Sequence, residues 1–194
     1  MNSIWDIGCD HGILGLSFLQ YPAITKIHLV DPSIDVIRTL HNKLIDSYIT
    51  KQPLIEIQHK KGQDVILNPE PKVIFIAGMG GREIQEIIKN LLPQLTPFDR
   101  LVISPHRNIL ELRQFLQVSA LRLVDEVAIQ EDGQFYQILC LETSVQFPAV
   151  SLYGEKIWQG PVGEQYRQHQ IRSIGLHQDQ ASKAYVSYLK LLSY

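Results

Sequence analysis

The chain has 194 residues, 45% of them hydrophobic and 20% charged, and a formal net charge of −2. This composition is that of an ordinary globular domain. It excludes a disordered chain and one that binds nucleic acid through overall positive charge. Two cysteines, Cys9 and Cys140, are too few for a disulfide framework or a zinc site, and no apolar run could span a membrane. The sequence therefore predicts a cytoplasmic protein with no membrane segment and no metal.

The first predicted strand, residues 4–7, leads into a turn with Gly8 and Gly12, and residues 13–19 follow as a predicted helix. Open α/β sheets use a strand, a glycine turn and a helix to bring backbone N–H groups against a nucleotide-like ligand. The same pattern occurs in turns that bind nothing, so the motif alone leaves both interpretations open. The strand begins shortly after Met1, which indicates either a minimal fold or a trimmed N-terminus.

A second strand is predicted over residues 26–30, followed by Asp31 and by a helix over residues 34–45. Asp31 lies about twenty residues beyond Gly8, where an acidic side chain of a dinucleotide or adenosyl fold meets the ribose hydroxyls. The alternative is that Asp31 caps the helix that follows it.

Two more strands are predicted over residues 54–58 and 73–76, and the second is continuously apolar, as in a strand buried on both faces. The strand over residues 73–76 is followed by three glycines within four residues. Such a density of glycine lowers stability unless something must approach the backbone closely. The segments that close the two strands are Lys61-Gly62-Gln63-Asp64 and Ala77-Gly78-Met79-Gly80-Gly81.

A fifth strand is predicted over residues 101–104, opening into Pro105-His106-Arg107-Asn108 and a helix. Two last strands, residues 121–129 and 135–141, are joined by a hairpin turn. The pattern predicts an α/β fold in which five βα units form a mostly parallel sheet with an antiparallel edge. Beyond Gln146 the chain becomes polar, with one or two predicted helices. Their apolar stripe is Ala181, Ala184, Tyr185, Tyr188, Leu189 and Leu192.

The ligand loops of a parallel sheet lie at the carboxyl ends of its strands, and the unusual residues fall there. That coincidence favours a ligand loop over a structural turn. The spacing Gly8-x3-Gly12-x2-Gly15 departs from the dinucleotide fingerprint, and Asp10 would repel a pyrophosphate. No Walker lysine follows the glycines. A ligand with ribose but no phosphate suits the loop, and S-adenosylmethionine carries the cationic groups that Asp10 would attract.

Four motifs in sequence carry a family resemblance. They are Asp6-Ile7-Gly8-Cys9-Asp10-His11, Ile76-Ala77-Gly78-Met79-Gly80-Gly81, Asp125-Glu126-Val127 and Glu131-Asp132-Gly133-x2-Tyr136. Over about residues 4–162 the chain resembles the bacterial tRNA (adenine-22-N1)-methyltransferase family. The resemblance implies a Rossmann-like class I methyltransferase fold with a seven-stranded sheet. It also implies S-adenosylmethionine as donor and N1 of a tRNA adenosine as acceptor.

Site residues follow from the resemblance by matching positions. Residues 1–146 would form the S-adenosylmethionine-binding catalytic domain, and residues 147–194 a linker and short helical appendage. Asp10 and His11 are the expected catalytic residues. The expected donor-binding residues are Asp6, Gly8, Asp10, Asp31, Gln63, Asp64, Ala77 and Gly78. The expected substrate-binding residues are Met79, Gly80, Gly81, His106 and Arg107.

The chain departs from the family pattern at several places. The family's helix ahead of the first strand is missing, and the C-terminal helical extension is short, which bears on how tRNA would be held. Gly62-Gln63-Asp64 replaces an expected Gly-Asp, and Pro105-His106 replaces Pro-Asn. The tRNA partner and a monomeric or weakly dimeric state are expectations of the same resemblance.

N1 of neutral adenine has a free lone pair, so methyl transfer requires positioning rather than deprotonation. The methylated base is cationic, and a carboxylate beside it stabilises the developing charge. We expect Asp10 to supply that carboxylate and His11 to orient it or the base. The alternative for His11 is a structural, hydrogen-bonded role.

RNA contact would come from local basic residues, of which Arg107 is the predicted phosphate contact. The alternative for the others is solvated helix faces. They are Arg82, Lys89, Arg100, Arg113 and Arg122. Rival functions are a methyltransferase of the same fold acting on a small molecule or protein, and a non-catalytic module that binds adenosyl ligands or RNA. A nicotinamide oxidoreductase is disfavoured by the loop spacing.

Overall fold

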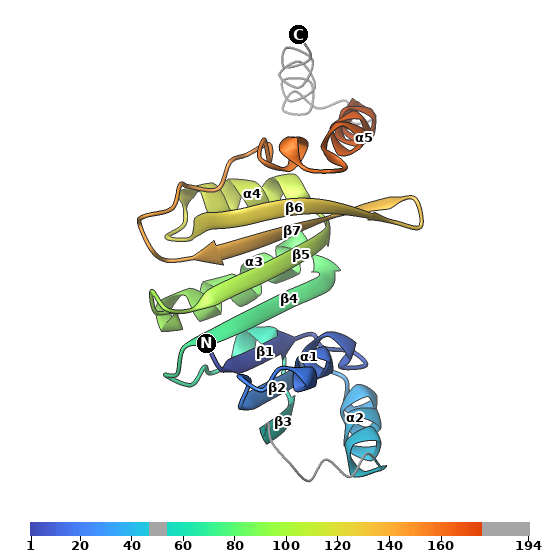
Figure 1. Cartoon of the computed structure of the whole chain (residues 1–194), viewed down its shortest axis with the longest axis vertical. Coiled ribbons are helices and arrows are strands. Elements are labelled where there is room, and N and C mark those ends of the chain that lie inside the picture. Colours follow the sequence, from blue (N-terminus) through green and yellow to red (C-terminus); the bar gives the residue numbers. More distant parts are fainter. Residues whose placement is uncertain (47–53, 176–194) are drawn as a thin grey trace.

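The computed structural model describes residues 1–46 and 54–175, and within them the strands form one seven-stranded sheet (Figure 1). The strand order is β3-β2-β1-β4-β5-β7-β6. The first five strands are parallel, and β7 runs antiparallel to both β5 and β6. This confirms the predicted parallel sheet with an antiparallel edge. The strands are β1 (Ser3–Ile7), β2 (Lys26–Asp31), β3 (Leu54–His59), β4 (Lys72–Gly80), β5 (Arg100–Arg107), β6 (Arg122–Glu131) and β7 (Gln134–Glu142).

Helices cover both faces of the sheet. Neighbouring residues of a strand point to opposite faces and therefore pack against different helices. On β1, Ile4 packs in one core cluster with Leu29 and Leu40 on the side of α1 and α2. Ile7 packs with Ile84 of α3 in a second cluster on the other face. In Figure 1, α3 and α4 lie behind the sheet. The helices are α1 (Ile13–Ser17), α2 (Ile34–Asp46), α3 (Gly81–Leu91), α4 (Ile109–Val118) and α5 (Gly163–Gly175), with short 3-10 turns η1 (Phe18–Gln20), η2 (Gly62–Asp64), η3 (Leu92–Gln94) and η4 (Ile157–Gln159).

Two predicted connections differ in the structure. Of the glycine segment predicted as a loop after the fourth strand, residues 77–80 belong to β4 and Gly81 begins α3. The pairing of β4 with β5 shifts register between Ala77 and Met79 and again at Gly80. Such an irregularity needs a backbone that a glycine adopts easily, and Gly78 has φ 77°. The prediction of five βα units is wrong at the third, because only η2 lies between β3 and β4. Prolines 69 and 71 in that connection disfavour a helix.

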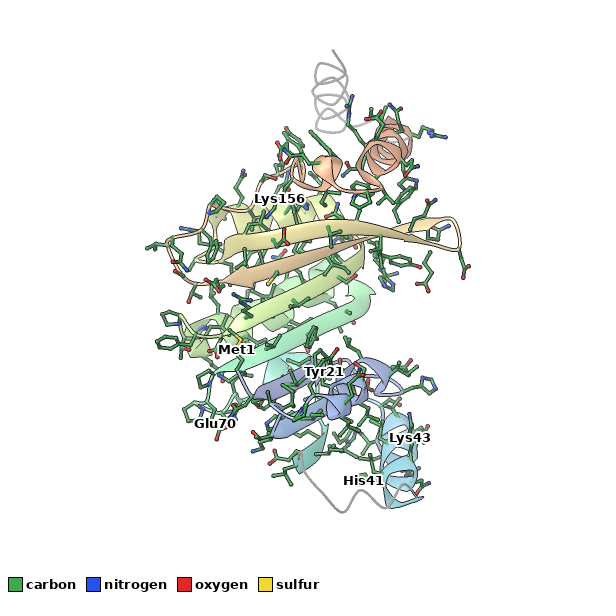
Figure 2. All side chains as sticks on the ribbon, in the orientation of Figure 1. Met1, Tyr21, His41, Lys43, Glu70 and Lys156 are labelled. Atoms are coloured by element: carbon green, nitrogen blue, oxygen red, sulfur yellow. The ribbon has the colours of Figure 1, made fainter. Side chains whose placement is uncertain are left out.

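Residues 147–175 pack against the antiparallel edge of the sheet. Ile157 and Tyr166 are buried with Ala128 of β6 in a third apolar cluster. Lys156, labelled in Figure 2, reaches the carboxylate of Asp125 on β6 with its Nζ at 2.7 Å from Oδ1, and this contact lowers the pKa of Asp125. The predicted apolar stripe from Ala181 to Leu192 lies outside the described residues.

Candidate functional site

The carboxyl ends of β1 to β5 meet at one edge of the sheet, on the right in Figure 1, and the predicted site residues gather along it. The turn between β6 and β7 also projects at this edge, since β7 starts level with the end of β5. Asp132 and Gly133 at its tip have φ values of 49° and 77°, as the predicted hairpin turn requires.

The turn after β1 is folded back on the end of β2. The amides of Gly8 and Cys9 both donate to the carbonyl of Val30, at 2.8 and 3.1 Å. Gly8, Asp10 and Gly12 have φ values of 76°, 48° and 69°, in the left-handed region. The two glycines adopt it freely, and aspartate is among the few other residues that tolerate it. The turn therefore keeps one defined shape.

Asp6 supports this turn from beneath. Its side chain is buried at 3% exposure, and Oδ2 accepts a hydrogen bond from the amide of Gly15 at 2.8 Å. Burial raises the pKa of Asp6 to about 6; the Gly15 amide opposes the shift and the charge of Asp31 adds to it. A Cβ on Gly15 would lie 2.5 Å from Leu29, so this glycine permits close packing of α1 on the sheet. Asp6 thus shapes the site without lying on its surface.

Asp31 closes β2 with both carboxylate oxygens engaged. Oδ2 accepts from the amide of Asp10 at 3.1 Å, and Oδ1 accepts from the amide of Ser33 at 2.8 Å. The cap of α2 is Ser33, whose Oγ accepts from Val36 at 3.4 Å, so the alternative that Asp31 caps this helix is wrong. Each oxygen of Asp31 keeps a lone pair, which is what a ribose hydroxyl would use.

Asp10 and His11 form an exposed pair at the mouth of the turn. His11 Nδ1 lies 2.9 Å from Asp10 Oδ2, and both side chains are 70% exposed. Lys43 on α2, labelled in Figure 2, reaches the carbonyl oxygen of His11 at 3.4 Å. Cys9 behind them is buried, which with the neighbouring carboxylates raises the pKa of its thiol to about 12. Its thiol is therefore unreactive at neutral pH, and the polar chemistry of the turn belongs to Asp10 and His11.

The segment after β3 divides into a buried and an accessible part. Gly62 is buried, and a Cβ there would lie within 3 Å of Ile87 on α3 and Ile7 on β1. Gln63 is half-buried and Asp64 is exposed. Packing thus accounts for the glycine, and the two following side chains remain available to a ligand.

The glycine segment of β4 divides in the same way. Met79 packs over Gly8, so the ends of β4 and β1 touch. Gly78 is exposed, with nothing within 4 Å of its Cβ direction. Gly80 and Gly81 are buried beneath Arg107 and the residue that follows it; a Cβ on Gly81 would lie 2.5 Å from the carbonyl oxygen of Asn108. Of the three glycines, Gly78 alone presents open backbone.

The end of β5 carries His106 and Arg107, both exposed. The ring of His106 lies 5.2 Å from that of Tyr136 on β7. Tyr136 was not among the predicted site residues, although it closes the fourth family motif. The signal that could have identified it is the antiparallel pairing of β5 with β7, which sets Tyr136 level with His106. Ala77 lies half-buried on β4 beside Ser104 of β5.

Arg113 contradicts both readings of the basic residues. It was expected on a solvated helix face or against RNA, yet it is 2% exposed. Its guanidinium contacts Glu126 and Gln137 and donates to the carbonyl of Ser151. Its positive charge is therefore compensated inside the protein.

Membrane-spanning helices and metal-binding clusters are both absent from the described residues, 1–46 and 54–175. None of their helices is long and apolar enough to cross a membrane. No group of three or more His, Cys, Asp and Glu side chains among them could hold a metal ion.

Comparison with known proteins adds a family and several relatives. Residues 1–139 match the model of the family described as "Methyltransferase domain". The tRNA (adenine(22)-N(1))-methyltransferase of Bacillus subtilis is 31% identical over 141 residues, which are 71% of this chain and 57% of that protein. The chain therefore spans less than two thirds of the length of this relative.

Two solved structures share the fold. A Streptococcus pneumoniae protein in complex with S-adenosyl-L-methionine superimposes with a TM-score of 0.80 at 22% identity, covering 98% of this chain and 92% of that one. The structure of the Bacillus subtilis m1A22 tRNA methyltransferase gives a TM-score of 0.70 at 23% identity, covering 97% and 87%. At these identities the likeness establishes the fold.

Proposed function

The chain belongs to the methyltransferase-domain family, and on that premise we propose that it transfers a methyl group from S-adenosylmethionine to N1 of an adenosine in tRNA, of the adenine-22 class. The observation that carries this proposal is the convergence of three predicted loops at one sheet edge, where Met79 lies over Gly8 and Asp31 binds the Asp10 amide. The name of the Bacillus subtilis relative supports the acceptor.

On the donor side, Asp31 would accept the ribose hydroxyls with its remaining lone pairs. Gln63 and Asp64 would flank the adenine of the donor. Gly8, Ala77 and Gly78 would line the donor pocket, and Asp6 would act through Gly15 by holding the first turn of α1 in place. Asp10, with its exposed carboxylate, would attract the cationic amino and sulfonium groups.

S-adenosylmethionine supplies an electrophilic methyl group on a sulfonium. The adenine N1 lone pair forms the new N–C bond, the methyl C–S bond breaks with its electrons going to sulfur, and the base becomes cationic. No proton has to be removed, so Asp10 would act by electrostatic stabilisation of the forming cation. His11, at 2.9 Å from Asp10, would orient that carboxylate.

On the acceptor side, Met79 and the backbone of Gly80 and Gly81 would form the floor between donor and base. His106 and Arg107 would contact the tRNA nucleotide from the end of β5. A tRNA substrate implies action in the cytoplasm, and a monomer or weak dimer remains the prediction for the assembly.

The test separates donor binding from transfer in the Asp10→Asn variant. Asparagine tolerates the left-handed backbone of position 10 (φ 48°) and removes the charge. Asp132→Asn, at φ 49° on the hairpin tip, is the matched control. We expect wild type and control to form 1-methyladenosine in unfractionated tRNA, detected by nucleoside analysis, and Asp10→Asn to lose transfer by about 100-fold.

Calorimetry with S-adenosylmethionine completes the test. Normal transfer by Asp10→Asn with normal donor binding would contradict the role of Asp10. Donor binding by wild type without methylation of any tRNA would contradict the proposed acceptor. It would instead favour a small-molecule or protein acceptor, or a non-catalytic module.

A further inference from the structure

Two neighbouring residues at the end of β5 serve opposite faces of the sheet. The ring of His106 contacts that of Tyr136 on β7. By alternation along β5, His106 points away from the face on which Leu101 and Ile103 pack with α3. The side chain of Arg107 lies over Gly80 and lines a cavity of about 460 Å³ on the other side of the strand end. The aromatic contact of His106 and the cationic side chain of Arg107 are thus one residue apart in the chain.

We propose that the end of β5 is a two-sided nucleotide clamp, in which Tyr136 and His106 stack against the target base and Arg107 binds a phosphate beside it. The proposal rests on the proposed function and deepens it, because it names how the acceptor nucleotide is held and adds Tyr136 to the site.

The two rings are arranged to receive a third. Their centroids lie 5.2 Å apart and the rings are tilted by 59°, so the two rings are not stacked face to face. The contrast is Trp5 and His28 in the core, which are stacked at 3.7 Å and 10° and use their faces on each other. An extruded base needs aromatic or apolar faces to replace its lost stacking. The segment from Ala77 to Gly81 has no aromatic residue, so this contact must come from a neighbouring strand.

Tyr136 is held firmly enough to act as a platform. It lies in a regular stretch of β7, paired with Ile129 of β6, and is half-buried. Its neighbour Phe135 points to the opposite face, where it contacts Tyr166 of α5 at 5.6 Å. The strand is therefore anchored from the far side while Tyr136 stays on the side of His106.

The cavity on the other side suits one phosphate. Gly80, Arg82, Glu83, Arg107 and Asn108 line it. Arg82 has a carboxylate 3.6 Å away on Glu111, and Glu83 adds negative charge. Among the described residues Arg107 has no carboxylate partner. A Cβ at position 80 would lie 2.9 Å from Arg107 Nε, so Gly80 lets the guanidinium lie against the strand end. An exposed arginine that lies against the strand end and has no carboxylate partner among the described residues matches a single phosphate group.

The stacking half is tested with Tyr136→Leu and Tyr136→Phe. Leucine keeps an apolar side chain but has no ring, whereas phenylalanine keeps the ring. Stacking of a base on an aromatic side chain contributes about 1–3 kcal/mol. We therefore expect Tyr136→Leu to lower kcat for tRNA about tenfold or more, while Tyr136→Phe retains most of the rate. Tyr21→Leu, at an exposed tyrosine remote in sequence and beside Phe18, is the control and should match wild type.

The phosphate half is tested with Arg107→Gln against Arg38→Gln, an exposed arginine on α2. Losing one phosphate contact should reduce the slope of log KM against log salt by about one for Arg107→Gln and leave it unchanged for Arg38→Gln. An unaltered slope, or equal loss of activity in Tyr136→Leu and Tyr136→Phe, would overturn the clamp.

Binding measurements separate this result from the proposed function. Fluorescence titration with tRNA measures affinity without turnover. Tyr136→Leu and Arg107→Gln should weaken the affinity for tRNA, and Tyr136→Phe should weaken it less. If wild type binds tRNA and does not methylate it, the transfer reaction fails and the clamp is still decided by these titrations. If wild type neither binds nor methylates tRNA, both are overturned. In every variant, unchanged affinity for S-adenosylmethionine reports an intact fold.

Discussion

Two buried carboxylates from the family motifs, Asp6 and Glu126, sit in opposite electrostatic situations. Asp6 lies at the edge formed by the carboxyl ends of β1 to β5, which carries the proposed donor site (the ligand edge). It is 3% exposed and accepts from the amide of Gly15, and among the described residues it has no cationic partner. Glu126, where α4 meets β6 and β7, is 5% exposed and lies 2.5 Å from the guanidinium of Arg113. Burial raises the pKa of Asp6 to about 6, because the folded protein leaves its charge uncompensated.

The difference shows how the two regions divide their tasks. At the junction where α4 meets β6 and β7, the charge of Glu126 is paired with that of Arg113. Arg113 also contacts Gln137, and Gln137 contacts Tyr166 of α5. At the ligand edge, Asp10, His11 and Arg107 are exposed, and Asp6 and Asp31 hold the turn through backbone amides. Changes at the junction should therefore alter stability without altering ligand affinity. Changes at the edge should alter ligand affinity and should cost less stability than changes at the junction.

The largest expected effect is the loss of the carboxylate from Glu126. Glu126→Ala leaves the buried guanidinium of Arg113 unpaired and should lower the free energy of unfolding by about 3–5 kcal/mol, measured in urea. Glu111→Ala removes an exposed carboxylate 3.6 Å from Arg82 and should cost less than about 1 kcal/mol.

If Glu126→Ala does not fold, a double variant tests whether the unpaired charge of Arg113 is the cause. Replacing both partners, as Arg113→Met with Glu126→Leu, removes the charges together and should be more stable than the single variant. Donor affinity should match wild type in every variant that folds. A loss of stability no larger than that of Glu111→Ala would break the comparison.

Sequence periodicity was sufficient for the order of the strands, because buried strands have their own repeat, but it did not exclude a helix in the third βα unit, where the structure has only η2. It failed where a residue has two uses. Gly78 and Gly80 were predicted in a loop, yet they lie in the last residues of a bulged strand, since glycine suits both a loop and a bulge. Arg113 was grouped with surface arginines because its partners, Glu126 and Gln137, come from strands whose pairing follows only from the fold.

The candidate site shows the same limit. Asp31 and Asp10 could be placed from motif spacing, since Asp31 ends β2 and Asp10 lies in the turn after β1, and these two strands are parallel. That Asp6 lies beneath the turn, and that Gly80 and Gly81 lie beneath Arg107 and Asn108, depends on packing between β4, β5 and α1. Tyr136 enters the edge through antiparallel pairing, which no local spacing encodes. Sequence thus locates the edge, and packing decides which of its residues face outward.

A second, smaller effect should appear in the pH dependence of stability. Because folding raises the pKa of Asp6 from 3.8 to about 6, the folded protein holds this proton more tightly than the unfolded chain. The stabilisation is complete below pH 3.8 and is lost as pH rises to about 6. Asp6→Asn keeps an acceptor for Gly15 and cannot ionise. The stability of wild type relative to Asp6→Asn should therefore fall by on the order of 2 kcal/mol between pH 4 and 7.

His28 also titrates in this range, so the pH dependence of the free energy of unfolding must be measured as a difference between wild type and Asp6→Asn. Burial lowers the pKa of His28 to about 4, so its contribution has the opposite sign: it is present above pH 6.5 and is lost as pH falls to about 4. Both proteins contain His28, and its contribution cancels between them. Urea unfolding of the two proteins at four pH values is sufficient. A difference that does not vary with pH would mean that Asp6 is compensated like Glu126.

The smallest expected effect on stability gives the most selective test of the edge. Gly78 and Gly133 both have φ 77°, and in neither case does any atom lie within 4 Å of the position a Cβ would take. Alanine at either site should cost about 1 kcal/mol through the left-handed backbone alone. The two variants thus carry the same strain, one at the proposed donor pocket and one at the hairpin tip. Thermal unfolding should show equal losses.

Ligand binding should then separate the two alanine variants. The methyl group at position 78 would occupy space that we assign to the donor and the base, so Gly78→Ala should weaken S-adenosylmethionine binding and tRNA methylation by about tenfold. Gly133→Ala should leave both unchanged. Equal ligand affinities in the two variants would mean that the open backbone at Gly78 faces solvent and contacts neither donor nor base. In that case the glycine would be required by the bulge of β4 rather than by a ligand. Gly78 would then serve the fold, as Glu126 and Arg113 do at the junction.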